Sequence, residues 1–78
     1  MPSRVLWRPQ ELDSRQCEIC GVSSTSFLVT LFDQPVSVAA EQLDANHEVE
    51  SFAYCARHEQ DSLEKAGHLQ SEHDRPSG

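Results

Sequence analysis

Seventy-eight residues are enough for one small domain, and only 37% of them are hydrophobic. So small a chain buries too little apolar surface to be stable by core packing alone, so a disulfide, a metal or a partner should supplement its core. The formal net charge of −7 repels phosphate backbones and disfavours nucleic acid as a partner. The longest apolar run, Phe27-Leu28-Val29, is far shorter than the ~20 residues that cross a membrane, so no membrane partner is expected.

The cysteine count indicates a compartment. Three is an odd number, whereas disulfide frameworks of secreted proteins usually carry an even one. The first residues do not resemble a secretion signal, so we expect a reducing, cytoplasmic location, where paired cysteines are metal ligands or redox groups more often than disulfides. One lysine beside five arginines, with 13 acidic residues, is also typical of a high-salt cytoplasm. In such a cytoplasm the Debye length would shrink to ~3 Å or less. The acidic composition would then serve solubility and say little about partners.

The chain divides into three predicted segments. Residues 1–15 are expected to form an N-terminal extension, in which residues 9–12 make one helical turn because proline suits the first helical position. Residues 16–67 are predicted to form a zinc-binding domain. Residues 68–78 lack hydrophobic periodicity and are expected to form a disordered C-terminal tail.

Two strands and a helix are predicted within the domain. Residues 27–32 are β-branched and aromatic and should form a buried strand. Residues 47–54 should form a second strand that pairs with it in an antiparallel hairpin, whereas residues 36–46 suit a strand or a short helix equally well. Residues 55–66 are good helix formers, and Gly67 is expected to end that helix.

Two ligand pairs stand out, Cys17-x-x-Cys20 and Cys55-x-x-His58. Two residues between ligands let a tight turn direct both side chains at one ion, and Gly21 relieves crowding where the chain leaves that turn. Positions i and i+3 share one face of a helical turn, and zinc takes four such ligands in a tetrahedron. The sequence therefore predicts one Zn²⁺ site.

Other chemistry for these residues stays open. Cys17 and Cys20 could form a thioredoxin-like redox pair, with Cys55 a buried core thiol, but the flanking sequence offers no βαβ context. His47 is an alternative fourth ligand should His58 not be one. A closed site of four protein ligands predicts a structural zinc and not a catalytic one.

The order of knuckle, strand pair and helix resembles the treble-clef class of zinc fingers with Cys-Cys-Cys-His ligation. The resemblance covers roughly residues 15–67 and implies a small α+β zinc-stabilised fold: a zinc knuckle, an antiparallel β-hairpin and a C-terminal helix. Two features depart from the pattern, a 34-residue gap between Cys20 and Cys55 and the lack of a second glycine on the helix side. A zinc ribbon, with the second pair on another knuckle, is the alternative.

The favoured function is a small non-enzymatic, zinc-binding, protein-interaction or regulatory module. The alternative is a zinc-dependent nucleic-acid-binding regulator, whose phosphate contacts would come from Arg4, Arg8 and Arg15 on the N-terminal extension and from Arg57 beside the site. Treble clefs also occur in His-Asn-His nucleases, and Asn46-His47 invites that comparison. No Asp/Glu-His pair falls at the place that these nucleases use between their knuckles, however, and a nuclease groove needs positive charge, so a degenerate nuclease is the least favoured hypothesis.

Overall fold

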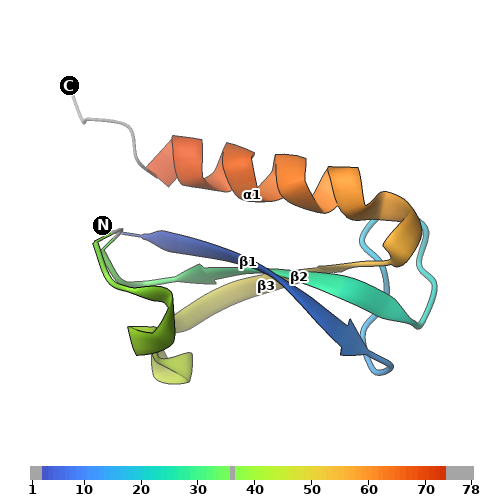
Figure 1. Ribbon diagram of the computed structural model, residues 1–78, viewed down its shortest axis with the longest axis horizontal. Coiled ribbons are helices and arrows are strands. Elements are labelled where there is room, and N and C mark those ends of the chain that lie inside the picture. The colour runs from blue at the N-terminus through green and yellow to red at the C-terminus, as the bar shows by residue number, and fades with distance from the viewer. Residues whose placement is uncertain (1–2, 36, 74–78) are drawn as a thin grey trace.

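The computed structural model describes residues 3–35 and 37–73. Its centre is a three-stranded antiparallel sheet of β1 (Arg4–Leu12), β2 (Thr25–Phe32) and β3 (Glu48–Tyr54), in the order β1-β2-β3. The helix α1 lies across one face of this sheet (Figure 1). The predicted small α+β class, with an antiparallel hairpin and a C-terminal helix, is confirmed.

The N-terminal segment belongs to the sheet. β1 pairs with β2 from Arg4 opposite Phe32 to Leu12 opposite Thr25, with an irregularity after Pro9. The predicted helical turn over residues 9–12 is wrong, and residues 4–12 form an edge strand instead of an extension. The physical reason is that β2 is buried along most of its length and needs a hydrogen-bonding neighbour on each side.

The two strands predicted from their composition are confirmed. β2 is buried at Thr25 and from Leu28 to Phe32, and it pairs antiparallel with β3 in a register that sets Phe27 opposite Tyr54. Between them, the segment that suited strand or helix contains two short 3₁₀ turns, η1 (Ala40–Gln42) and η2 (Ala45–His47). The Asp44 side chain accepts a hydrogen bond from the Asn46 N–H at 2.9 Å and so caps the second turn. Val36 lies outside the described residues.

The C-terminal helix begins later and ends later than predicted. The 3₁₀ turn η3 (Ala56–His58) precedes α1 (Glu59–His73), which runs through Gly67 without a break. An interior glycine costs a helix roughly 1 kcal/mol, but the turns after it have partners. Leu69 is buried against the sheet, and the Gln70 side chain accepts a hydrogen bond from the Val5 N–H at 3.1 Å. Residues 74–78 of the predicted tail lie outside the described residues.

The core lies between the helix and the face of the sheet that it covers. Its buried members, with their half-buried neighbours, are Val5, Val29, Leu31, Tyr54 and Leu69, then Trp7, Phe27, Phe52 and Ala66. Trp7 stacks on Phe27 with ring centroids 5.6 Å apart, and its indole N–H donates to the buried Ser62 hydroxyl at 2.8 Å. The core thus draws on all three strands and α1. Over the described part of the chain, no helix has the length and apolar character needed to cross a membrane.

Candidate metal centre

The first ligand pair lies on a tight turn between β1 and β2. The Cys17 N–H donates to the Val22 carbonyl at 2.9 Å, and the Gly21 N–H donates to the Cys17 carbonyl at 3.0 Å. Closing this turn puts Gly21 at φ +79°, a left-handed conformation that glycine adopts without steric cost. The Ile19 N–H donates to Cys17 Sγ at 3.4 Å. The turn over residues 17–22, called the knuckle below, therefore holds and orients the first sulfur.

The second ligand pair lies where β3 turns into η3. Cys55 is still extended, with φ −78° and ψ 170°, and caps the 3₁₀ turn, whose N–H at His58 donates to the Cys55 carbonyl at 2.9 Å. This turn brings Cys55 Sγ and His58 Nδ1 to 3.2 Å. The predicted pairing at i and i+3 is confirmed, but its location in the first turn of an α-helix is wrong, because the α-helix starts one residue after His58.

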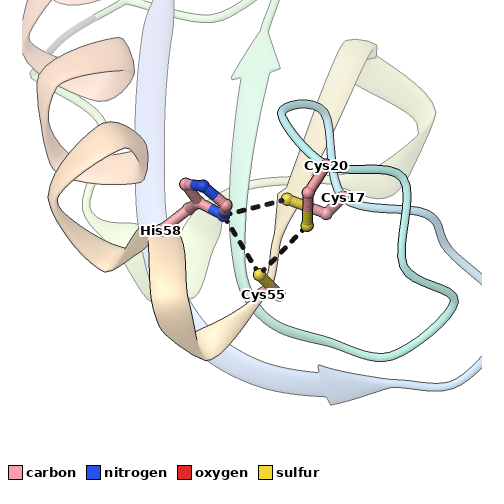
Figure 2. A group of neighbouring side chains, drawn as sticks. All are labelled: Cys17, Cys20, Cys55 and His58. Carbon is pink, nitrogen blue, oxygen red and sulfur yellow. Dashed lines mark hydrogen bonds between the residues drawn. The ribbon is translucent and has the colours of Figure 1, made fainter.

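All four predicted ligand residues converge. Figure 2 shows the three sulfurs and His58 Nδ1 directed at one small volume, and these four donor atoms all lie within 4.8 Å of one another. Cys20 Sγ lies 3.6 Å from Cys55 Sγ, and Cys17 Sγ lies 3.7 Å from His58 Nδ1. The three cysteines are free thiols, so Cys17, Cys20, Cys55 and His58 could hold a metal ion.

Three of these spacings can be compared with those of a tetrahedral zinc site. Zinc in a tetrahedron, with Zn–S of about 2.3 Å and Zn–N of about 2.05 Å, separates sulfurs by about 3.8 Å and a sulfur from a nitrogen by about 3.6 Å. The sulfur–sulfur distance of 3.6 Å and the sulfur–nitrogen distances of 3.7 and 3.2 Å match these edges within about 0.4 Å. The donor set and these three distances are therefore compatible with a tetrahedral zinc ion.

The site favours thiolate at one sulfur. Burial opposes ionisation of Cys17, but the backbone of Cys20, Cys55 and Ile19 hydrogen-bonds to its sulfur and lowers the pKa to about 6. Burial raises the pKa of the Cys55 thiol above its usual value, and the hydrogen bonds and charge of the neighbouring cysteines add to that rise. Two sulfurs within 4.8 Å of each other cannot both ionise readily without a cation, so a metal ion would relieve their repulsion.

The surroundings of the site are acidic. Burial, with the carboxylates of Glu18 and Asp61, raises the pKa of Tyr54. Tyr54 immediately precedes Cys55, and Glu18 lies between the two cysteines of the knuckle. The field around the candidate centre is therefore negative and attracts cations.

The alternative fourth ligand is not part of this cluster. His47 is exposed and ends η2, before β3, whereas Cys55 follows the last residue of β3. Seven residues of strand separate the two by roughly 23 Å, and the cluster among the described residues contains His58 instead. His58 is therefore the histidine that the fold brings to the sulfurs.

The four arginines proposed for phosphate contacts are scattered over the fold. The Arg4 guanidinium donates to the carbonyls of Val38 at 3.3 Å and Val5 at 2.7 Å. Arg15 donates to the hydroxyl of Ser51 at 2.6 Å and to its carbonyl at 2.9 Å. Arg8 and Arg57 are exposed, on β1 and η3. Two of the four thus use their guanidinium groups within the chain, and nucleic-acid binding stays a prediction.

A surface hollow next to the centre was not foreseen. It lies between the knuckle, the end of β3 and the first turns of α1, and Ile19, Phe52 and Tyr54 contribute its apolar part. The one signal in the sequence that could have indicated this surface is the isoleucine at position 19, between the two ligand cysteines of the knuckle.

Fold and site together define a small α+β protein with a Cys₃His cluster that could hold one metal ion. No protein-family model matches the chain, and no curated protein or solved structure matches it. Its class therefore rests on the geometry of its own site.

Proposed function

We propose that this protein is a non-enzymatic zinc module in which one structural Zn²⁺, bound by Cys17, Cys20, Cys55 and His58, supports a surface that binds another protein. The observation that carries the proposal is the convergence of the four donor atoms within 4.8 Å. Three sulfurs and one imidazole nitrogen are a common ligand set of structural zinc.

A structural role follows from the number of ligands. Four protein ligands fill the tetrahedron and leave no position for the water that catalytic zinc keeps. Three thiolates also give the bound site a formal charge of −1, which weakens the metal as a Lewis acid. Structural zinc contributes roughly 10–16 kcal/mol of apparent binding free energy in finger peptides, enough to dominate the stability of a 78-residue chain.

The treble-clef class is the architecture that we propose. The knuckle comes first, the β2–β3 hairpin follows, and the second ligand pair lies where β3 passes into η3 and α1. The long gap between the ligand pairs is occupied by the hairpin and its connection. β1 is an addition that pairs with the outer side of β2. Architecture alone indicates no partner.

A protein partner suits the surface better than nucleic acid does. The net charge is −7, and α1 carries acidic residues from its first turn onward. Arg4 and Arg15 donate to their own chain and so compete poorly for phosphate. A small regulator that acts through protein contacts is the role most consistent with these charges.

Two measurements test the proposal. Elemental analysis of the purified protein should find one zinc per chain, and none after replacement of the ligands. A gel-shift titration from low to physiological ionic strength should find no binding to DNA or RNA. A metal-free protein with the same stability would contradict the structural zinc, and salt-sensitive binding to nucleic acid would favour the regulator alternative.

A further inference from the structure

The hollow beside the candidate metal centre is open to solvent and large enough to admit side chains of a partner. Its volume is about 660 Å³, within the ~300–1,000 Å³ range of ligand pockets. Ile19 is 56% exposed, and Phe52 is half-buried with one face of its ring accessible to the Lys65 side chain. Ile19 and Phe52 therefore supply the accessible apolar surface, whereas Tyr54 is buried beneath it.

Carboxylates surround this apolar floor. Glu18 comes from the knuckle, and Asp61 and Glu64 come from the first turns of α1. The structure records no ion pair between these three groups and a basic residue of the described chain. Their charge is therefore available to a cation from outside, and the net charge of −7 adds long-range attraction.

The chain itself shows how a cation would sit there. The Lys65 ammonium group lies 4.6 Å from the centre of the Phe52 ring, within the ~6 Å reach of a cation–π contact. Lys65 borders the same hollow. The ring is thus already positioned to accept a positive charge, and Lys65 occupies the place that an incoming cation would take.

A metal ion at the four ligands would support one wall of the hollow. Glu18 and Ile19 lie between Cys17 and Cys20, so their position depends on the knuckle that the metal would hold. The other wall comes from α1, which follows the second ligand pair directly. Binding of zinc would therefore fix the distance between the two walls.

We infer that this hollow binds a segment of a partner protein that presents a lysine or arginine side chain next to an aliphatic one. The basic group would lie among the carboxylates and over the Phe52 ring, and the aliphatic group would contact Ile19. This inference rests on the proposed function and specifies the chemistry of its partner.

The test uses the zinc-loaded full chain and short capped peptides in which lysine alternates with leucine, with glutamate–leucine peptides as the comparison. Amide chemical-shift changes should appear around Ile19, Phe52 and Lys65 with the basic peptides only. The three carboxylates around the hollow, called the rim below, are neutralised in the triple variant Glu18→Gln, Asp61→Asn, Glu64→Gln. This variant should bind the basic peptides about tenfold more weakly.

Two control variants separate local recognition from net charge. The variant Asp33→Asn, Glu41→Gln, Glu48→Gln removes three other negative charges, away from the hollow. It should change the affinity for the basic peptides less than twofold. Lys65→Gln should tighten binding several-fold, because it frees the Phe52 ring and removes a repelling charge. Each variant must keep its zinc and its amide dispersion, which shows that it is folded.

Several outcomes would overturn the inference. Equal weakening by the rim variant and by the variant away from the hollow would indicate attraction by net charge alone. Chemical-shift changes at other residues only, or no changes at all, would show that the hollow is not the recognition surface. Chemical shifts at the hollow that depend on protein concentration without peptide would show that a second copy of the chain covers it. In each case a full complement of zinc leaves the proposed structural metal standing, whereas loss of zinc-dependent folding would overturn that proposal separately.

Discussion

The backbone N–H of Glu18 donates to the carbonyl of Ala53 across 2.9 Å. Glu18 lies within the knuckle, and Ala53 lies near the end of β3, two residues before Cys55. This hydrogen bond therefore holds the first ligand pair beside the strand that leads to the second. One such bond contributes about 1 kcal/mol, far less than the roughly 10–16 kcal/mol of a structural zinc ion. A bound metal ion should therefore contribute most of the free energy that holds the two ligand pairs together.

Metal removal should unfold the protein. Excess chelator should abolish the native fluorescence of Trp7, which packs on Phe27 in the core, because the knuckle and the start of α1 lose their common anchor. Circular dichroism and fluorescence during thermal unfolding would measure the loss, and added zinc should restore the fold. A chelated protein with an unchanged unfolding midpoint would show that the core suffices without metal.

The two histidines considered as the fourth ligand should differ sharply. His58→Ala should weaken zinc affinity by at least about 100-fold, since loss of a direct ligand should exceed the ~10–100-fold effect of losing an outer-shell partner. His47→Ala is the matched control, because His47 is exposed on η2 and should leave affinity unchanged. Competition with a chromophoric chelator measures both. Equal losses in the two variants would refute the assignment of the fourth ligand.

The two described glycines that have open space around them should respond in opposite directions to alanine. Gly21 has φ +79° and Gly67 lies within α1, and an added Cβ at either would meet nothing within 4 Å. Gly21→Ala should destabilise by about 1–2 kcal/mol, the cost of a left-handed backbone. Gly67→Ala should stabilise by about 0.8–1 kcal/mol through helix propensity. Urea unfolding of the zinc-loaded variants checks both signs, and the same sign for both would contradict the backbone assigned to the knuckle or to the helix.

β1 should be essential to the fold. The Trp7 indole N–H donates to the Ser62 hydroxyl at 2.8 Å, and that hydroxyl in turn donates to the Glu59 carbonyl at 2.5 Å. A double-mutant cycle of Trp7→Phe and Ser62→Ala should show coupling of about 1 kcal/mol.

Deletion of residues 1–12 should prevent folding, because it removes a hydrogen-bonding neighbour from the buried strand β2. A stable, zinc-bound truncated chain would show that these residues are an extension after all.

Metal affinity should fall as the pH decreases. Zinc must displace the proton of Cys55 whenever that thiol is protonated, since its pKa is raised, and below about pH 6 it must also displace the proton of Cys17. The pKa of Cys17 is lower in the folded chain than in the unfolded one. Its ionisation therefore also stabilises the fold at high pH, and this contribution is lost as the pH falls through about 6. Zinc competition at pH values on both sides of 6, calibrated for the chelator alone, measures the slope, and a flat profile would contradict thiolate ligation.

The sequence predicted the parts of this protein that depend on local spacing. Two ligands at i and i+3 approach each other through one turn of backbone, so Cys17 with Cys20 and Cys55 with His58 were recognisable as pairs. β2 was recognisable because an uninterrupted β-branched and aromatic run has few alternatives to a buried strand, and β3 was recognisable from the alternation of its side chains between two faces.

Tertiary structure decided the rest. Residues 4–12 have no strong strand pattern of their own. They become β1 because they pair with the free edge of β2, and because Trp7 stacks on Phe27 and donates a hydrogen bond to Ser62. α1 continues past Gly67 because Leu69 and Gln70 gain contacts with the sheet. The local chemistry of ligands is set by residue spacing, whereas the extent of a strand or helix depends on long-range partners that only the folded chain supplies.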